Sequence, residues 1–157
     1  MALRCSALFA GCINSSPLVL SFNLTNATTM EQVWPFISNT NAIAVNQDWA
    51  GHPGREVSIT NSSSSSSSRS GPKVWTKPLS GGRQAVLVVN MGGAATLTEI
   101  ELDMAVIAPK LACASGAAGC VVSDVWRNKT AGTTTGGSSY KVSPGLASHD
   151  SEFLIFG

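Results

Sequence analysis

The sequence has little charge and no long apolar run. Only 12% of its 157 residues are charged, the formal net charge is +1, and no cluster of Lys or Arg occurs. This balance gives no electrostatic basis for binding nucleic acid or an anionic membrane surface. No apolar stretch approaches the roughly 20 residues that a membrane-spanning helix needs. We therefore expect neither nucleic acid nor a membrane among the partners.

Groups that serve as nucleophiles or metal ligands are scarce as well. The two histidines have no Cys or carboxylate at ligand spacing beside them, so no metal site is predicted. No Gly-x-Ser-x-Gly segment occurs, and the seven serines at 62–68 are too flexible to hold a nucleophile in place. Glu99, Glu101 and Asp103 share one face of an expected strand, which favours a solvent-exposed charged face over a glycosidase carboxylate pair. The patterns predict no catalytic residue and no cofactor.

Strand patterns dominate the chain after residue 54. Apolar runs and alternations, separated by Gly-rich or Ser-rich turns, are typical of short antiparallel strands. The expected strands cover residues 56–60, 73–78, 83–91, 96–103, 121–126, 139–143 and 152–156. Within them, the continuous apolar run 85–89 is the best candidate for a central strand. The fold class predicted is therefore mainly β, with an antiparallel β-sandwich over residues 55–157.

The first 54 residues follow helical patterns around one short apolar run. Residues 1–13 fit a short signal peptide or a buried helix, and apolar residues recurring on one helical face favour the helix. Residues 17–21 are typical of a strand buried on both faces. A capping box at Thr28 and Glu31 predicts the start of a further helix, and Gly51, Pro53 and Gly54 end the helical region. This helix–strand–helix unit is too small to close a sheet of its own.

The cysteines and glycosylation motifs favour a secretory route. Cys113 and Cys120 flank a small flexible loop, which favours a disulfide between them over free thiols. Cys5 and Cys12 are about 10 Å apart along a helix and cannot bond to each other. Asn61 and Asn128 are the candidate glycosylation sites among five Asn-x-Ser/Thr motifs, the others being Asn14, Asn23 and Asn26.

Three aromatic residues raise the possibility of sugar stacking. Trp75, Trp126 and Tyr140 occur in or near expected strands. Trp75 and Trp126 lie within apolar strand patterns, where packing in the core is the favoured role. The aromatic residues therefore leave a carbohydrate-binding module open without supporting it.

Several motifs together resemble a known enzyme family. SPLVL at 16–20 and IAVNQD at 43–48 are followed by VWTKPL at 74–79, AVLVVN at 85–90 and DVWR at 124–127. Their order and spacing resemble the C-terminal part of the α-galactosidases of glycoside hydrolase family 27. The resemblance implies a remnant of a (β/α)8 catalytic barrel over residues 1–54 and a C-terminal β-sandwich domain over residues 55–157. One departure is FNLT at 22–25, where the family usually has NDLR or TDLR.

The resemblance implies a C-terminal portion of a retaining glycosidase that hydrolyses terminal α-galactosides. In the family, both catalytic Asp residues lie on earlier barrel strands that have no counterpart here, so we expect the chain to be inactive alone. Apolar residues of 1–50 should then need cover from a partner or from the missing barrel. The family also implies a galactoside or other carbohydrate as ligand and an extracellular, lysosomal or vacuolar location. The alternatives are a secreted accessory or carbohydrate-binding module without catalysis and an anchored surface protein.

Overall fold

The protein consists of a helical segment followed by two packed antiparallel sheets. The computed structural model describes residues 6–20, 22–58, 72–92, 100–111, 113, 119–134, 139–143 and 145–157. The helices are α1 (Ser6–Asn14), α2 (Ala27–Ile37), α3 (Thr40–Gln47) and the short α4 (Met104–Ile107), and a 3-10 turn spans Ser80–Gly82. The strands are β1 (Arg55–Val57), β2 (Pro72–Pro78), β3 (Gln84–Asn90), β4 (Ile100–Asp103), β5 (Val121–Asp124), β6 (Lys129–Thr133), β7 (Ser139–Val142) and β8 (Ser151–Phe156).

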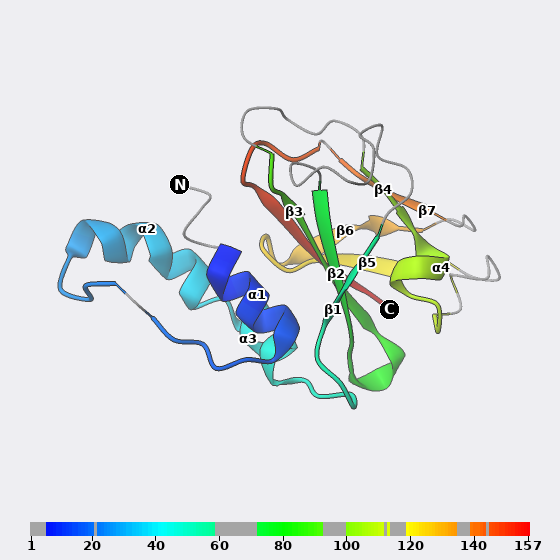
Figure 1. The fold of residues 1–157 in the computed structure, drawn as a ribbon, viewed down its shortest axis with the longest axis horizontal. Coiled ribbons are helices and arrows are strands. Elements are labelled where there is room, and N and C mark those ends of the chain that lie inside the picture. The colour runs from blue at the N-terminus through cyan, green and yellow to red at the C-terminus, as the bar shows by residue number, and fades with distance from the viewer. Residues whose placement is uncertain are drawn as a thin grey trace.

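The larger sheet has six strands in the order β1-β2-β3-β8-β5-β6, and β4 pairs with β7 in the smaller sheet. Every pairing is antiparallel. Figure 1 shows α1, α2 and α3 on one side of the larger sheet and the β4–β7 pair with α4 on the other. The mainly β, antiparallel fold class is therefore confirmed.

Strand β3 explains how one sheet can be buried on both faces. Val86 and Val88 belong to the core between the sheets, whereas Leu87 and Val89 belong to the core beneath the helices. Because successive side chains of a strand point to opposite faces, a run of five apolar residues suits a strand covered on both sides. Pairing of β3 with both β2 and β8 gives it the internal position that its sequence predicts.

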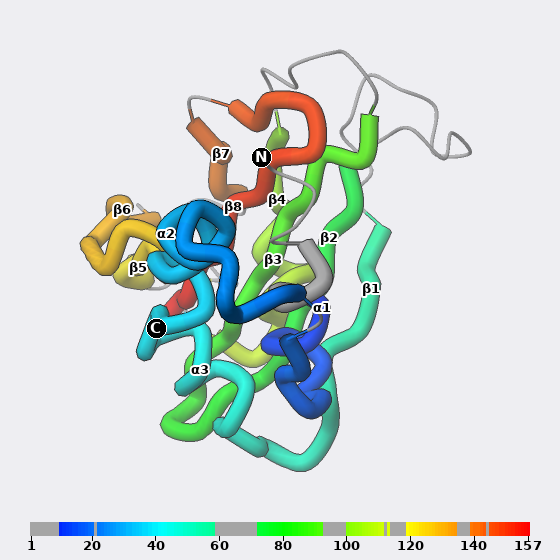
Figure 2. Tube along the Cα trace, turned by 90° about the vertical axis from the view of Figure 1, so that its left-hand side faces the viewer, coloured from blue at the N-terminus to red at the C-terminus, as the bar shows by residue number. Residues whose placement is uncertain are grey.

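The second core joins the helices to the larger sheet. Cys12 and Ile13 of α1 and Ala42 and Val45 of α3 are buried against side chains of β3, β8 and their flanking turns. Figure 2 shows the three helices lying across the face of this sheet. The aromatic ring of Phe36 also meets that of Trp126 edge to face, with ring centroids 6.4 Å apart. Among the helices of the described segments, none combines the length and apolar character that a membrane crossing requires.

The predicted start of α2 is wrong by one or two residues. Asn26, not Thr28, is the N-cap, and its side-chain oxygen accepts a hydrogen bond of 2.9 Å from the backbone N–H of Thr29. Asn is as good an N-cap as Thr, so the first suitable side chain along the chain takes the position. Pro35 lies in the last turn of this helix rather than in its first turns.

The buried strand predicted at residues 17–21 is also wrong. Residues 16–20 form neither helix nor strand, and Ser21 lies outside the described residues. Val19 is 79% exposed and Leu20 is 41% exposed. A buried strand needs hydrogen-bonding neighbours on both sides, and the described part of the chain supplies none for this segment. The segment before residue 55 therefore contains three helices and no strand among its described residues.

Strand β6 was missed because its sequence, KTAGT, has no strong strand former apart from Thr. It lies at the edge of the larger sheet, where it is mostly exposed and needs little apolar character. Residues 59–60 and 96–99 of two expected strands lie outside the described residues.

Gly54 lies where the chain leaves the helical segment, and its backbone passes close to α1. Its backbone N–H donates a hydrogen bond of 2.9 Å to the carbonyl oxygen of Ile13. A Cβ at position 54 would lie 2.5 Å from that same oxygen. Only glycine permits this approach without a backbone shift.

We expect Gly54→Ala to lower the free energy of unfolding by about 1–3 kcal/mol, because the added methyl group must push α1 away from the chain exit. Urea denaturation followed by circular dichroism measures the change. Gly132→Ala is the matched control, since a Cβ there meets no atom within 4 Å, and we expect a change within about 0.5 kcal/mol. Equal effects of the two substitutions would contradict the close contact.

Candidate functional site

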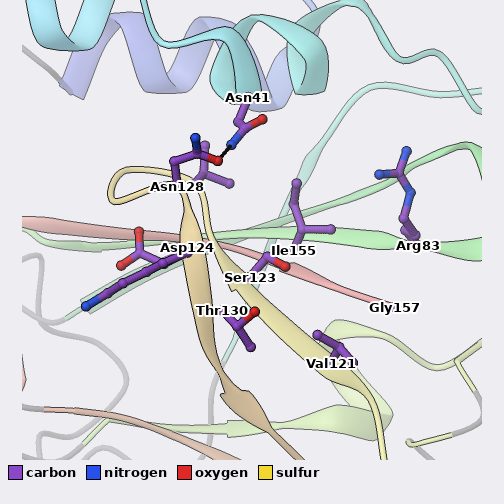
Figure 3. Close-up of a pocket in the computed structure, with 11 residues that line it drawn as sticks. Asn41, Arg83, Val121, Ser123, Asp124, Asn128, Thr130, Ile155 and Gly157 are labelled. Carbon is purple, nitrogen blue, oxygen red and sulfur yellow. Dashed lines mark hydrogen bonds between the residues drawn. The ribbon is translucent and has the colours of Figure 1, made fainter.

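A groove of about 530 Å³ lies on the helix-facing side of the larger sheet, near its β5–β6 end. Figure 3 shows Val121 and Ser123 of β5, Thr130 of β6 and Ile155 of β8 along its base, with Asn41 of α3 above. Further lining residues are Arg83, Asp124, Val125, Asn128, Lys129 and Gly157. The groove therefore combines aliphatic side chains, hydroxyls and amides.

The rim of the groove is closed at one side by two amides. Asn41 Nδ2 donates a hydrogen bond of 2.7 Å to Asn128 Oδ1, which ties α3 to the turn between β5 and β6. Asn128 has φ of 50°, a left-handed conformation that Asn tolerates better than most residues. Asn128 is exposed, so the turn holds its amide at the surface.

An ionic cluster lies next to the groove. The Arg127 guanidinium contacts Asp124 Oδ2 at 2.5 Å and Glu152 Oε1 at 3.1 Å. Both carboxylates are largely buried, with side-chain exposures of 1% and 11%. Burial raises the pKa of Glu152, and the charge of Arg127 opposes that rise. One guanidinium thus binds both acids, which holds them together instead of presenting them across a cleft.

The C-terminal end of α3 is held by a buried lysine. Lys77 of β2 is fully buried, and its Nζ donates to the carbonyl oxygens of Val45 and Asn46. These carbonyls are unpaired helix-end acceptors that favour a cation. Burial lowers the pKa of Lys77, and the nearby Asp48 charge opposes the decrease. Burial also raises the pKa of the neighbouring Cys12 thiol to about 11, so this cysteine packs as a neutral side chain.

Asp48, the residue that caps α3, binds the turn between β2 and β3. Its carboxylate accepts hydrogen bonds from Ser80 N–H at 2.9 Å and Ser80 Oγ at 2.8 Å, and contacts Arg83 at 3.3 Å. Burial alone would raise the pKa of Asp48, but the two bonds from Ser80 and the charges of Arg83 and Lys77 together lower it. The helical segment and the sandwich are therefore joined by specific polar contacts as well as by apolar packing.

We expect Asp48→Asn to lower the free energy of unfolding by about 1–2 kcal/mol at neutral pH, because the amide keeps an acceptor for Ser80 but loses the charge. The folded-state pKa of Asp48 lies below its ordinary value of 3.8. Its contribution is therefore present above that value and is lost as the pH falls through the lowered pKa. Urea titrations of both proteins at several pH values measure the difference.

Glu56→Gln is the control for that experiment. Glu56 binds Lys73 at 2.7 Å, but both side chains are at least 40% exposed, and such surface pairs contribute less than about 1 kcal/mol. A loss in Asp48→Asn that stays unchanged down to the most acidic pH at which both proteins remain folded would show that the effect does not come from the carboxylate charge.

A scan against family models identifies residues 69–156 as an alpha galactosidase C-terminal beta sandwich domain. This match covers more than half of the chain. The chain belongs to that family.

Solved structures share the fold of the sandwich and of the helical segment before it. α-Galactosidase I from Mortierella vinacea matches with a TM-score of 0.75 and 20% identity, over 99% of this chain and 35% of that one. The α-galactosidase MEL1 from Saccharomyces cerevisiae matches with a TM-score of 0.74 and 17% identity, over 99% and 43%. A GH27 β-L-arabinopyranosidase from Geobacillus stearothermophilus gives 0.72 and 18%, over 99% and 30%. The search of curated protein sequences gives no match.

The chain therefore spans between a third and a half of the length of the two α-galactosidases. At these identities the likeness concerns the fold. It nevertheless extends over nearly all of this chain, so the helices before residue 55 match those structures together with the sandwich.

The structure places the residues predicted from the sequence as follows. Cys113 and Cys120 are joined by a disulfide. Asn128 is exposed beside the groove, whereas Asn61 lies outside the described residues. Cys5 and Glu99 also lie outside them. Glu101 accepts a hydrogen bond of 2.5 Å from Ser139 Oγ. In the described part of the chain, no three His, Cys, Asp or Glu residues gather as metal ligands.

The aromatic residues do not line the groove. Trp126 packs against Phe153 with ring centroids 5.2 Å apart, and Tyr140 packs edge to face on Phe156 at 5.4 Å. Trp75 is partly buried beside the core under the helices. Their packing agrees with the core role favoured from sequence.

Sequence reasoning missed the groove and Lys77. The groove lies where α3 meets β5 and β6. No local sequence pattern predicts this contact. The strand of Lys77 also contains Lys73 and Thr76, so the local sequence did not indicate which lysine is buried.

Proposed function

We propose that this chain is the C-terminal part of an α-galactosidase-like glycoside hydrolase that acts on terminal α-galactosides. The observation that carries the proposal is the family match over residues 69–156, supported by a fold likeness that extends through the helices at the other end of the chain. In this proposal residues 1–54 belong to the catalytic barrel and residues 55–157 form the sandwich domain. The residues of other parts of the enzyme would perform the chemistry.

The acidic residues support inactivity of the isolated chain. A retaining glycosidase needs two carboxyl groups about 5–5.5 Å apart that face each other across the bound sugar. Among the described residues, Asp124 and Glu152 lie near each other, but both bind Arg127 and are largely buried. Neither is free to attack a sugar or to protonate a leaving group.

Exposed apolar side chains support the proposal that a further part of the enzyme covers the helical segment. The large apolar side chains exposed on the helical segment are Val19, Leu20, Leu24, Trp34 and Trp49. In this proposal the remaining part of the barrel, in the same or another polypeptide, covers them. Residues 16–20 would then gain the strand neighbours that they lack here.

A secretory location belongs to the same proposal. The Cys113–Cys120 disulfide suits an oxidising compartment. Asn128 is exposed and could carry a glycan, and Asn61 is the second proposed acceptor. Extracellular, lysosomal and vacuolar locations all satisfy these features.

We expect purified residues 1–157 to hydrolyse 4-nitrophenyl α-galactoside no faster than buffer, because the described residues present no facing carboxylate pair. The release of nitrophenol measures the rate, with α-galactosidase I of Mortierella vinacea as the positive control. Turnover that survives purification and is abolished by Asp124→Asn or Glu152→Gln would contradict this expectation.

The positive test isolates the natural protein with an antibody raised against residues 139–157. The precipitate should hydrolyse the same substrate and should contain sequence that supplies two further acidic barrel residues. An inactive precipitate that contains only residues 1–157 would overturn the assignment to a working hydrolase.

A further inference from the structure

The base of the groove alternates aliphatic and hydroxyl surface. Val121 is 49% exposed, and Ile155 lies on the neighbouring strand β8, where it is the partner of Ser123. Ser123 and Thr130 are paired across β5 and β6, so their side chains emerge on the same face. Among the described residues, neither hydroxyl has a hydrogen-bond partner. The base thus offers C–H contacts and free hydroxyls within one short stretch of sheet.

The rim adds donors and an acceptor at fixed positions. The bond from Asn41 Nδ2 to Asn128 Oδ1 leaves Asn41 Oδ1 as an acceptor, and it leaves Asn128 Nδ2 as a donor in protein that carries no glycan at Asn128. Arg83 approaches from the other end (Figure 3), oriented by its bonds to Ser80 O and Asp48 Oδ2. These groups are held by α3, by the β5–β6 turn and by the β2–β3 turn, which makes the arrangement preorganised.

The charged lining residues of β5 and β6 contribute little from their side chains. Asp124 alternates with Ser123, so its carboxylate lies on the opposite face, where it binds Arg127. Lys129 is the strand partner of Asp124 and emerges on that same opposite face. Arg83 is therefore the one cationic side chain directed at the groove among the described residues, and it already contacts Asp48.

We propose that this groove is a non-catalytic binding site for a neutral monosaccharide unit. Its volume of about 530 Å³ lies within the range of about 300–1,000 Å³ that small-molecule sites occupy. Amides, hydroxyls and a guanidinium over an aliphatic base match the mixed C–H and hydroxyl surface of a sugar ring. A nucleotide would need an aromatic platform and more cations, and an apolar ligand would leave the polar rim unpaired. The site goes beyond the proposed hydrolase function, since it needs no carboxylate chemistry.

The experiment follows backbone and side-chain amides of the full chain by ¹H–¹⁵N NMR during titration with methyl α-D-galactopyranoside and, separately, methyl α-D-glucopyranoside. Production in bacteria leaves Asn128 without a glycan. We expect saturable shifts at Ser123, Thr130 and the Asn128 side-chain amide, with a Kd on the order of 1–10 mM for at least one sugar. Glycerol at the same hydroxyl concentration should not reproduce them.

Two variants separate the groove from the rest of the sheet. Thr130→Val removes one free hydroxyl and should weaken binding roughly three- to tenfold, the effect of one lost hydrogen bond. Thr133→Val makes the same change on the same strand, outside the lining residues, and should leave the Kd unchanged. Absence of saturation with either sugar, shifts that glycerol reproduces, or equal weakening by both variants would each overturn the proposal.

Discussion

Replacing Arg127 with Met should lower the free energy of unfolding by about 2–4 kcal/mol at pH 7. The guanidinium is the cation that binds both Asp124 and Glu152. Without it, two largely buried carboxylates would lie near each other with no counter-ion, although the backbone N–H of residue 127 would still donate to Asp124 Oδ1. That loss is costlier than losing a surface ion pair. The expected loss in the free energy of unfolding is smaller than for a fully buried pair because the Arg127 side chain is 52% exposed.

The pH dependence identifies the cause of this loss. Burial already raises the pKa of Glu152 above its ordinary value of 4.5 in the presence of Arg127. Removing the guanidinium should raise that pKa further, so the unfavourable ionised form costs stability above the folded pKa. As the pH falls towards 4.5, protonation removes the charge and the deficit of the variant should shrink.

Urea titrations at pH 7 and at about pH 4.5, near the ordinary pKa of a glutamic acid, measure that difference. Lys129→Met is the matched control, because Lys129 is an exposed cation on the same hairpin, and its loss should be within about 0.5 kcal/mol. A deficit in Arg127→Met that is the same at both pH values would indicate lost packing instead of exposed charge.

Ile13→Ala should lower the free energy of unfolding by about 2–4 kcal/mol, and the loss should extend to the sandwich. Ile13 is fully buried in the core that α1 and α3 share with β3 and β8. Shortening it leaves a cavity at that junction. Because Phe153 and Leu87 line the same core, their strands should lose protection together with the helices.

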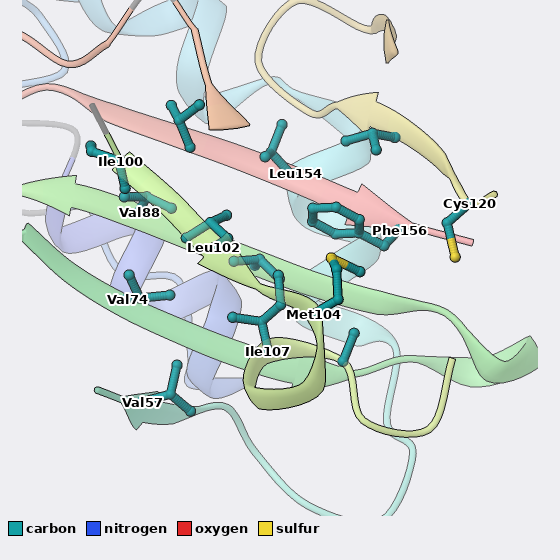
Figure 4. Packing of buried hydrophobic residues seen from close by; sticks show 14 of the residues in the cluster. Val57, Val74, Val88, Ile100, Leu102, Met104, Ile107, Cys120, Leu154 and Phe156 are labelled. Carbon is teal, nitrogen blue, oxygen red and sulfur yellow. The ribbon is translucent and has the colours of Figure 1, made fainter. Parts of the chain in front are cut away.

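Amide hydrogen exchange measured strand by strand tests this coupling. Ile107→Ala is the matched control, since Ile107 is equally buried in the other core, between the sheets (Figure 4). Both variants should then weaken protection of β3 and β8 by similar amounts. Faster exchange confined to α1 and α3 in Ile13→Ala would show that the helical segment and the sandwich unfold independently.

Local patterns were sufficient for most of the sandwich. The apolar runs of β3 and β8 predicted both strands within one residue of their observed bounds. The small loop between Cys113 and Cys120 was short enough to bring the two cysteines together, and they are bonded. In each case the signal lies within a few neighbouring residues, where side-chain direction and chain length decide the outcome.

Features that depend on residues far apart in the sequence could not be predicted from local patterns. Residues 17–21 have a strand composition, but a strand forms only where neighbours accept its backbone hydrogen bonds. The sequence contains Lys77 and Asp48 without indicating their roles, because those roles depend on the contact between the end of α3 and the β2–β3 turn. The groove likewise depends on three elements that are far apart in the sequence.

The position of β8 has a consequence for synthesis in the cell. This strand is the last of the fold in sequence, yet it lies inside the larger sheet, between β3 and β5. A ribosome that has made every earlier strand has therefore produced two half-sheets with unpaired edges. Those edges can associate with other chains until residues 151–156 leave the exit tunnel. Folding of the sandwich can then be completed only after β8 has left the tunnel, and a chaperone that shields the edge of β3 until that point would raise its yield.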